Sequence, residues 1–426
     1  MRLIGRDLKN KILPWMDRDE IIVIIGSRQV GKTTLVRLLL NDIPEGQKAY
    51  FDLEDMNILG ILNQGPHAFV NYLRLLGYPP EKRVVVALDE IQYIDNPSNF
   101  LKIIHDHHPN IKLIVSGSST LEIRQKFKDS LAGRKIVFEL DSLNFLEFLK
   151  FKGDSIARVK ENIGTIQDIL ENRFNPSSGL VKNELLPYLY EYLVFGGYPK
   201  VSQADDMKLK VSILNEIYSS YVRKDIKDIA NIEDILAFNN LLKLLSAQAG
   251  NMVNINEISG TLGINVATAK KYLFLLENTF IVSLLNPYFK NKRKEISKMP
   301  KVYLLDNGLR NTALSNFQLF GGRGDEGLLF ENYVFSELKK RFQVNKELFY
   351  WRTIAKAEVD FILNINNRIV PIEAKAHEMK QPALTRSFRS FIDTYKPDAG
   401  IVVNLSFSGT MEYGGCKIYF VPAYGI

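Results

Sequence analysis

The chain has 426 residues, 46% of them hydrophobic and 24% charged, and a formal net charge of +7. This composition is ordinary for a soluble globular protein, and the length predicts roughly two to four domains. The single cysteine, Cys416, excludes an intramolecular disulfide, and no apolar run approaches the roughly 18 residues that span a membrane. Residues 1–7 carry no apolar run typical of a signal peptide, so we expect a cytoplasmic protein with no membrane partner. The positive charge permits contact with nucleic acid without demonstrating it.

The first part of the chain alternates strand and helix patterns. The β-branched run 21–25 is typical of a buried parallel strand, and a loop over 26–32 and a helix opening at Thr33 follow it. The alternation predicts βαβ units and a parallel sheet over residues 1–140. Further strands are expected over 49–53, 84–88 and 111–116, and helices over 7–16, 68–76 and 99–108.

The rest of the chain predicts three further parts. Apolar residues at helical spacing indicate a helical lid over residues 141–235, with loop chemistry in the polar interval 150–182. Residues 236–320 indicate short helices with a tight turn at Gly263, which is the geometry of a helix-turn-helix or winged helix. Residues 321–426 read as mixed α and β. The expected fold class is therefore α/β multidomain.

A phosphate-binding motif lies between the first strand and the helix after it. The pattern G-x-x-x-x-G-K-[ST] is met at Gly26, Gly31 and Lys32-Thr33. Glycines let backbone N–H groups converge on phosphates, and the helix N-terminus adds a favourable field. Lys32 would reach the β- and γ-phosphates, and Thr33 would offer its hydroxyl to Mg²⁺. The expected contacts with ATP are Gly26, Ser27, Arg28, Gln29, Val30, Gly31, Lys32, Thr33 and Thr34.

Two later strands end in residues suited to ATP hydrolysis. The run 84–88 ends in Asp89-Glu90 and resembles a Walker B strand. Asp89 would hold Mg²⁺, and Glu90 would orient and polarise the attacking water. The next strand ends in small hydroxyl residues, at a place that resembles the sensor-1 position of AAA-type ATPases. Ser116 or Ser118 would contact that water or the γ-phosphate, or would simply make a turn.

Arg134 ends the run 130–134 and supplies an arginine after the fourth expected strand. It would act as an arginine finger, either on the nucleotide of a neighbouring copy or on its own, or it would stand on the surface. The first alternative favours a homo-oligomer and the second a monomer. The sequence leaves both open.

A turn within the helical part reads Phe-Gly-Gly-Tyr-Pro over residues 195–199. It resembles the lid motif of the origin-recognition and signal-transduction branch of AAA-type ATPases, in which the lid covers adenine. That resemblance implies nucleotide contacts for Gly197 and Pro199. The alternative is an ordinary turn between helices.

Acidic residues and a lysine are spaced along the last part of the chain in a recognisable pattern. Asp360 lies on one expected strand, Glu373 and Lys375 lie two apart on the next, and Glu331 lies on an upstream helix. The pattern resembles the PD-(D/E)-x-K nuclease core, with Val359 in place of proline. This implies Glu331, Asp360 and Glu373 as ligands of Mg²⁺ or Mn²⁺, and Lys375 near the attacking water. Such folds can also bind nucleic acid or protein without cutting it, so the pattern does not decide whether this domain is a nuclease.

The expected helix-turn-helix is followed by a basic run. Its second helix would carry Thr268, Lys270, Lys271 and Tyr272, and the cations after it are Lys290, Lys292, Arg293, Lys294, Lys298 and Lys301. A basic wing beside such a helix indicates contact with DNA phosphates. The equal alternative is an internal role, with the winged helix packed on the nucleotide domain as a switch.

Together these motifs resemble a prokaryotic group that pairs an AAA-like ATPase with an uncharacterised C-terminal domain. The matching segments are 26–34, 88–92, 115–119, 130–134, 142–149, 192–201, 221–226, 301–309, 330–334 and 358–375. The resemblance implies an ATPase core, a winged helix and a restriction-endonuclease-like domain. It favours an ATPase that acts on DNA or is regulated by it. The alternative is a regulatory switch of the signal-transduction type, whose C-terminal domain binds DNA or protein without cleavage.

Overall fold

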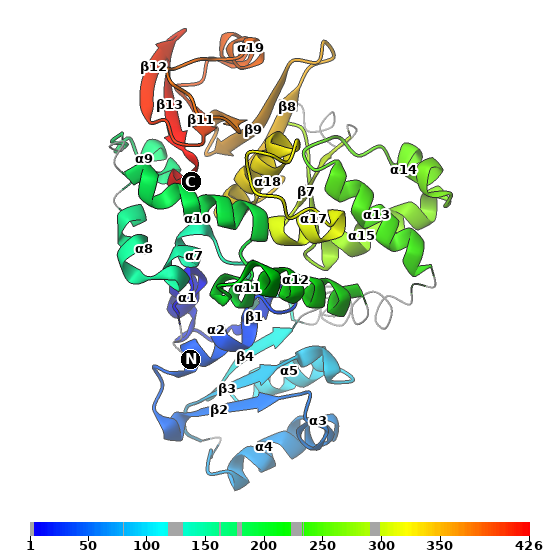
Figure 1. Ribbon diagram of the computed structural model, residues 1–426. Coiled ribbons are helices and arrows are strands. Elements are labelled where there is room, and N and C mark those ends of the chain that lie inside the picture. Colours follow the sequence, from blue (N-terminus) through cyan, green and yellow to red (C-terminus); the bar gives the residue numbers. More distant parts are fainter. Residues whose placement is uncertain are drawn as a thin grey trace. The chain divides into compact units, whose positions relative to one another are not determined.

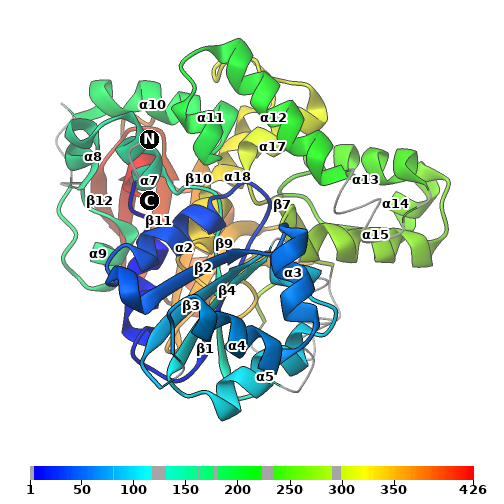
Figure 2. The same cartoon turned by 90° about the horizontal axis from the view of Figure 1, so that it is seen from below.

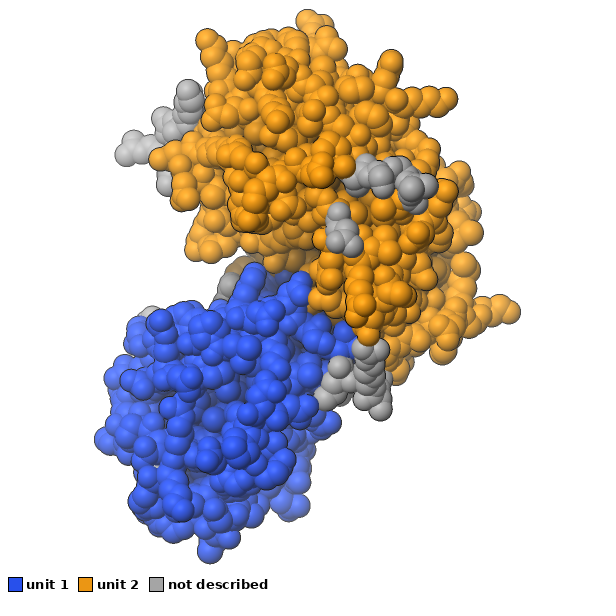
Figure 3. Space-filling model, turned by 90° about the vertical axis from the view of Figure 1, so that its left-hand side faces the viewer, with its two compact units in different colours: residues 1–141, 221–232, 278–280 blue, residues 142–220, 233–277, 281–426 orange. Residues whose placement is uncertain are grey.

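The computed structural model describes residues 4–79, 81–117, 131–161, 163–176, 181–222, 232, 234–289 and 299–426. The chain divides into two compact units, which Figure 3 shows in different colours. The first unit comprises residues 1–141, 221–232 and 278–280, and the second comprises 142–220, 233–277 and 281–426. The first boundary falls where strand patterns give way to helical patterns in the sequence.

The first unit is built on a five-stranded parallel sheet in the order β2-β3-β4-β1-β5. Figures 1 and 2 label strands β1 to β4 of this sheet. Strands β1 and β3 are buried along their whole length, as expected for parallel strands inside an α/β unit. The strands are β1 (Ile21–Ile25), β2 (Lys48–Asp52), β3 (Val84–Asp89), β4 (Ile111–Gly117) and β5 (Lys135–Glu139). The helices are α1 (Asp7–Ile12), α2 (Lys32–Leu40), α3 (Met56–Asn63), α4 (Pro66–Leu75) and α5 (Pro97–His107). The strands and helices predicted over residues 1–116 are confirmed.

Two elements of this unit, β5 and α3, are not predicted by the sequence patterns. Strand β5 lies at the edge of the sheet and is only half-buried, with Lys135 and Glu139 at its ends, so its apolar signal is short. Helix α3 is capped by the preceding residue, Asp55, whose side chain accepts a hydrogen bond from the Asn57 N–H. Such caps satisfy backbone donors that a short helix leaves unpaired.

The second unit begins with helices. They are α7 (Phe145–Lys152), α8 (Asp154–Glu161), α9 (Ile166–Leu170), α10 (Lys182–Phe195), α11 (Pro199–Gln203) and α12 (Met207–Tyr221), whose last residue belongs to the first unit. The polar interval 150–182 contains α8 and α9 as well as the expected loop segment, of which residues 177–180 lie outside the described residues. In α9 a capping box stabilises the first turn: Thr165 accepts from the Asp168 N–H and Asp168 accepts from the Thr165 N–H.

Three helices and a two-stranded antiparallel sheet follow. They are α13 (Ile235–Ala247), α14 (Ile255–Leu262), α15 (Val266–Asn278), β6 (Val282–Leu285) and β7 (Lys301–Leu304). Gly263 ends α14 with a φ of 66°, in the left-handed region that glycine enters at little cost. Helix α17 (Asn307–Leu314) comes next.

The end of the chain forms a six-stranded mixed sheet in the order β12-β13-β11-β10-β9-β8. Asn366 and Asn367 join β9 to β10 with φ values of 51° and 66°, as in tight hairpin turns, and the predicted hairpin is confirmed. The strands are β8 (Leu348–Arg352), β9 (Glu358–Ile365), β10 (Arg368–Lys375), β11 (Ala399–Asn404), β12 (Gly409–Tyr413) and β13 (Cys416–Pro422), and the helices are α18 (Glu326–Lys339) and α19 (Arg386–Tyr395).

Within the second unit, distant segments meet at the buried carboxylate of Asp306, just before α17. Its Oδ2 accepts from the Gly197 N–H at 2.8 Å, and its Oδ1 accepts from the Gly308 N–H at 2.8 Å. A Cβ added to Gly196 would lie 2.1 Å from Asp306 Oδ1, and one added to Gly197 would lie 2.3 Å from the Leu143 carbonyl oxygen. Glycine is therefore required at both positions for the segments to approach this closely.

A second buried carboxylate, Glu337 on α18, lies beside the same segments. Its Oε2 accepts from the Phe145 N–H at 3.1 Å, and its Oε1 accepts from the Tyr192 hydroxyl and the Lys340 ammonium, each at 2.9 Å. These contacts tie α7 and α10 to α18. The helical part and the C-terminal part thus form one packed body.

We expect Gly196→Ala to lower the free energy of unfolding by about 2 kcal/mol or more. The added Cβ would meet the Asp306 carboxylate, and the φ of +71° disfavours any side chain. Urea denaturation gives the measurement. Gly260→Ala is the control, because Gly260 lies in α14 with nothing within 4 Å of an added Cβ. An equal loss in both variants would contradict the Asp306 packing.

Candidate functional site

The phosphate loop joins β1 to α2. A Cβ added to Gly26 would lie 2.2 Å from the Leu140 carbonyl oxygen, so this residue must stay a glycine. Lys32 is 5% exposed, and its ammonium donates to the carbonyl oxygens of Gly26 at 3.1 Å and Ser27 at 2.9 Å. The lysine is therefore held against its own loop, and its contact with the β- and γ-phosphates stays a prediction.

Asp89, at the end of β3, accepts hydrogen bonds from hydroxyl groups on three neighbouring elements. Its Oδ2 accepts from the Thr33 hydroxyl of α2 at 2.5 Å and from the Tyr50 hydroxyl of β2 at 2.9 Å, and its Oδ1 accepts from the Ser116 hydroxyl of β4. Burial and then the charge of Asp89 raise the pKa of Tyr50, which keeps that hydroxyl protonated as a donor. The sequence singled out Thr33, Asp89 and Ser116, and the structure brings them together.

Glu90 follows Asp89 in a left-handed backbone conformation, with φ 57° and ψ 49°. This costs a residue with a side chain roughly 1–2 kcal/mol, and such strain is concentrated at functional sites. The side-chain amide of buried Gln92 donates to Glu90 Oε2. The chain therefore changes direction at Glu90, immediately after buried strand β3. Gln92 holds one oxygen of the Glu90 carboxylate.

Arg6, which precedes α1, supports the phosphate loop from behind. Its guanidinium is buried and donates to the Val30 carbonyl oxygen at 2.8 Å and to the Asp141 carbonyl oxygen at 2.7 Å. Sequence reasoning missed Arg6, Tyr50 and Gln92. Arg6 and Tyr50 belong to no motif and lie far along the chain from the residues they contact, and only Gln92, adjacent to Asp89-Glu90, offered a local signal.

The residues present fit a nucleotide bound with Mg²⁺. The loop precedes a helix N-terminus, where anions are favoured, and a buried ammonium lies at hand. The oxygens of Thr33 and Asp89 are in direct contact and belong to the hard ligand class that Mg²⁺ takes. Contacts of Ser27, Arg28, Gln29, Val30, Gly31 and Thr34 with ATP stay predictions.

Arg134 lies immediately before β5, at the amino end of the sheet. Its carbonyl oxygen accepts from the Ile21 N–H at 2.7 Å, and its Nε donates to Asp106 Oδ1 at 2.7 Å. The phosphate loop follows the opposite end of the five-residue strand β1, roughly 16 Å along. This position favours the surface alternative over contact with the nucleotide of its own chain, and a role as an arginine finger stays a prediction. Ser118 lies outside the described residues.

Gly197 and Pro199 form a turn between α10 and α11 in the second unit. Pro199 is the first residue of α11, and the Gly197 carbonyl oxygen accepts from the Leu143 N–H at 2.8 Å. The Gly197 N–H donates to Asp306. Both backbone polar groups of Gly197 therefore have hydrogen-bond partners within the second unit. Contact of this turn with adenine stays a prediction.

The predicted nuclease residues lie near one another on α18, β9 and β10. We define the carboxylate cluster as Glu331, Glu358, Asp360 and Glu373. Asp360 Oδ2 accepts from the Ala374 N–H at 2.8 Å, and burial followed by the charge of Glu331 raises the pKa of Asp360 to about 7. Burial also raises the pKa of Glu373, although Lys375 lies 2.7 Å from its Oε1.

Sequence reasoning placed Lys301 in the basic run, whereas the structure places it in the carboxylate cluster. It is 1% exposed, and its ammonium lies 3.1 Å from Glu331 Oε1 and 2.6 Å from Glu358 Oε1. Although burial disfavours the ammonium, the neighbouring carboxylates, Glu331 first, raise the pKa of Lys301 above its ordinary value. The cluster therefore contains an internal cation, paired with two of its carboxylates.

The expected metal ligands do not fit a divalent ion as they stand. Across the described ranges, no group of three or more His, Cys, Asp or Glu side chains is arranged to hold a metal. Glu331 is engaged by Lys301 and by the Tyr303 hydroxyl, and Glu373 by Lys375 and the Thr385 hydroxyl. The prediction of a metal held jointly by Glu331, Asp360 and Glu373 is not supported.

The expected recognition helix is α15. Lys270 and Lys271 are exposed on it and Thr268 is half-buried, but Tyr272 is 5% exposed and packs edge-on against Phe238 of α13. An outward role for Tyr272 is therefore wrong, because its ring belongs to the core between these helices. The predicted wing residues Lys290, Lys292, Arg293, Lys294 and Lys298 lie outside the described residues.

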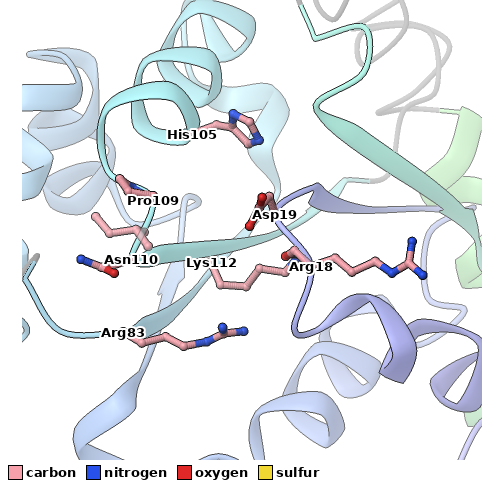
Figure 4. A pocket seen from close by; sticks show the side chains of 8 residues that line it. Arg18, Asp19, Arg83, His105, Pro109, Asn110 and Lys112 are labelled. Carbon is pink, nitrogen blue, oxygen red and sulfur yellow. Dashed lines mark hydrogen bonds between the residues drawn. The ribbon is translucent and has the colours of Figure 1, made fainter.

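A pocket of about 180 Å³ opens at the amino end of β4 in the first unit (Figure 4). The buried Lys112 ammonium donates to the Arg18 carbonyl oxygen at 2.6 Å and to the Glu20 carbonyl oxygen at 2.5 Å. Because the phosphate loop lies at the carboxyl ends of the strands, this pocket is separate from it. Its lining is Arg18, Asp19, Arg83, His105, Pro109, Asn110, Ile111 and Lys112.

Comparison with known families identifies three matched regions. An AAA domain matches residues 18–149, and two domains of unknown function, DUF8612 and DUF4143, match residues 186–319 and 326–423. The first unit is thus an AAA-type ATPase domain. Within the part of the chain that the structure describes, every helix is too short or too polar to span a membrane.

Whole-chain relatives and solved structures were also found. Uncharacterized protein MJ1544 of Methanocaldococcus jannaschii is 30% identical over 407 residues, which cover 93% of this chain and 83% of that protein. An uncharacterized protein of Haemophilus influenzae is 24% identical, with 96% and 95% covered. The Walker-type ATPase paby2304 of Pyrococcus abyssi is 14% identical, with a TM-score of 0.47 and coverage of 73% and 95%.

We expect Arg6→Ala to weaken ATP binding about tenfold. The variant would lose two hydrogen bonds from a charged group, each contributing roughly 1.5–3 kcal/mol. The phosphate loop would then be less ordered before binding, and part of the lost free energy would appear as lower affinity for ATP. Titration with a fluorescent ATP analogue gives the affinity. Arg18→Ala is the control, because that guanidinium stacks on Trp15 at 4.7 Å. Unchanged affinity in Arg6→Ala would remove its supporting role.

Proposed function

The chain belongs to the same protein family as MJ1544 of Methanocaldococcus jannaschii, and we propose that it is an ATP-hydrolysing switch whose nucleotide state controls binding of DNA by its second unit. The observation that carries the ATPase is the convergence of Thr33, Tyr50 and Ser116 on Asp89 beside the phosphate loop. The match of residues 18–149 to an AAA domain supports it.

We assign a separate role in ATP hydrolysis to each side chain of the site. When bound, ATP with Mg²⁺ supplies a γ-phosphate whose charge the ion offsets. Lys32 would exchange its carbonyl partners for phosphate oxygens, and Thr33 and Asp89 would hold the ion. Glu90 would orient the attacking water, with Gln92 holding its carboxylate. Ser116 would act through Asp89 and fix its rotamer.

Two observations favour a switch that binds DNA over a metal-dependent nuclease. Helices α13, α14 and α15 followed by the β6-β7 pair have the order of a winged helix, and α15 exposes Lys270 and Lys271. The carboxylate cluster is engaged by Lys301 and Lys375 rather than open to a metal. Binding without cleavage is therefore the role that we propose for the second unit.

We expect Glu90→Gln to keep nucleotide affinity and to slow ATP turnover by at least about a hundredfold, because an amide cannot polarise the attacking water. Phosphate release under single-turnover and steady-state conditions measures this. Glu81→Gln changes an exposed acid of the same unit and should leave turnover as it is. Equal turnover in Glu90→Gln and the parent would show that another group positions the water.

We expect Lys270→Ala and Lys271→Ala each to weaken duplex DNA binding for all sequences. Each lost phosphate contact should lower the slope of log affinity against log salt concentration by about 1. Fluorescence anisotropy over a salt series tests this, with exposed Lys380→Ala as the control.

The switch itself is tested in the same assay by comparing ATP with ADP. We expect DNA affinity to differ between the two nucleotides in the parent and in Glu90→Gln, and to be the same in Lys32→Ala. Identical affinity with both nucleotides in the parent would refute control by nucleotide state. The ATPase assignment would survive that result if hydrolysis still depended on Lys32 and Glu90.

A further inference from the structure

The carboxylate cluster of the second unit contains a lysine where the family resemblance leads one to expect a metal ion. We propose that the ammonium of Lys301 is the resident cation of this cluster, and that the cluster fastens β7 to α18 and β9 instead of binding Mg²⁺ or Mn²⁺. This inference concerns the second unit alone and stands whether or not the ATPase proposal is correct.

The position of Lys301 uses the oxygens that a metal would need. Its ammonium bridges Glu331 Oε1 at 3.1 Å and Glu358 Oε1 at 2.6 Å. Glu331 Oε1 also accepts from the Tyr303 hydroxyl at 2.7 Å. Since Mg²⁺ and Mn²⁺ bind through such oxygen lone pairs, an ion at this place would have to displace the ammonium.

The backbone around Lys301 leaves the ammonium little freedom to move aside. Lys301 pairs with Leu285 in the β6-β7 ladder and forms a bridge with Met252 on its other side. A Cβ added to Gly250 would lie 3.0 Å from Glu331 Oε1, so the main chain closes over that carboxylate. The Lys301 ammonium also lies 5.6 Å from the centre of the Tyr350 ring. Because Lys301 is 1% exposed, another rotamer of its side chain would have to displace the groups packed around it.

The remaining carboxylates are also engaged by groups of the chain itself. Glu358 Oε2 pairs with Arg352 at 2.6 Å, and Glu373 Oε1 pairs with Lys375 at 2.7 Å. Asp360 Oδ2 accepts from the Ala374 N–H. An ammonium differs from a divalent ion because it donates directed hydrogen bonds and needs no octahedral shell of oxygens. The cluster is therefore complete as an ion-pair network.

Manganese binding to the full chain tests the proposal, with Mn²⁺ alone as the probe. The measurements use nucleotide-free protein with Asp89→Asn in every variant, so that the phosphate site does not contribute. Calorimetry and the loss of the free Mn²⁺ electron paramagnetic resonance signal report binding. The variants compared are the Asp89→Asn parent, Lys301→Met, Lys301→Met with Asp360→Asn, and exposed Lys380→Met as the matched control.

We expect the parent and Lys380→Met to bind no stoichiometric Mn²⁺ at about 1 mM, which is above the dissociation constants of most dedicated sites. Lys301→Met should gain one Mn²⁺ per chain and should lose it again when Asp360→Asn is added. A parent that binds one Mn²⁺ and loses it with Asp360→Asn would overturn the proposal. A folded Lys301→Met that gains no Mn²⁺ would overturn it as well.

Removal of Lys301 can also unfold the second unit, because it leaves the half-buried carboxylates of Glu331 and Glu358 without their shared cation. Thermal unfolding of the same variants separates this case. If Lys301→Met unfolds while Lys380→Met does not, Glu331→Gln added to Lys301→Met should recover part of the lost melting temperature, since the carboxylate left without its cation is removed. No recovery, or an equal loss in both lysine variants, would count against Lys301 as the cation.

Discussion

A buried carboxylate must find its donors within the fold, and the second unit is organised around that constraint at Asp306. Because burial raises the pKa of Asp306, its charge depends on the backbone N–H groups that surround it. Those donors come from the turn after α10 and the start of α17, which are far apart in sequence. Leaving such a buried group without its hydrogen-bond partner typically costs roughly 1–3 kcal/mol or more, so the segments are held in one arrangement. The position of α18, and with it the C-terminal sheet, follows through Glu337.

Each candidate site contains a carboxylate that is surrounded by partners from the fold, but the partners differ in charge. Asp89 is surrounded by hydroxyl groups, which are neutral, so its negative charge stays available to an incoming cation. Glu331 is paired with an ammonium, which neutralises it in place. The first arrangement suits a carboxylate that must exchange partners during turnover. The second suits one that must not, and the contrast separates a proposed metal site from a structural ion pair.

The sequence predicted the parallel sheet, the phosphate loop and the C-terminal hairpin because each depends on local signals. Apolar runs, the glycine spacing and the Asn-rich turn are readable over a few residues. It did not predict Arg6, Tyr50 or the place of Lys301, because each acts on residues distant along the chain. Tyr272 was misjudged for a related reason: helical periodicity alone does not say which face meets Phe238. Strand β5 was missed because an edge strand needs few apolar residues.

The path of the chain has a consequence for how the protein can be divided. After Asp141 the polypeptide returns to the first unit over residues 221–232 and again over 278–280. A fragment that ends at Asp141 would carry the phosphate loop and every strand of the parallel sheet, yet would lack Tyr221, Val222, Ile232 and residues 278–280, which belong to the same unit. During synthesis the ATPase unit would likewise stay incomplete until more than half of the chain had left the ribosome. Completion of the first unit is therefore tied to synthesis of much of the second.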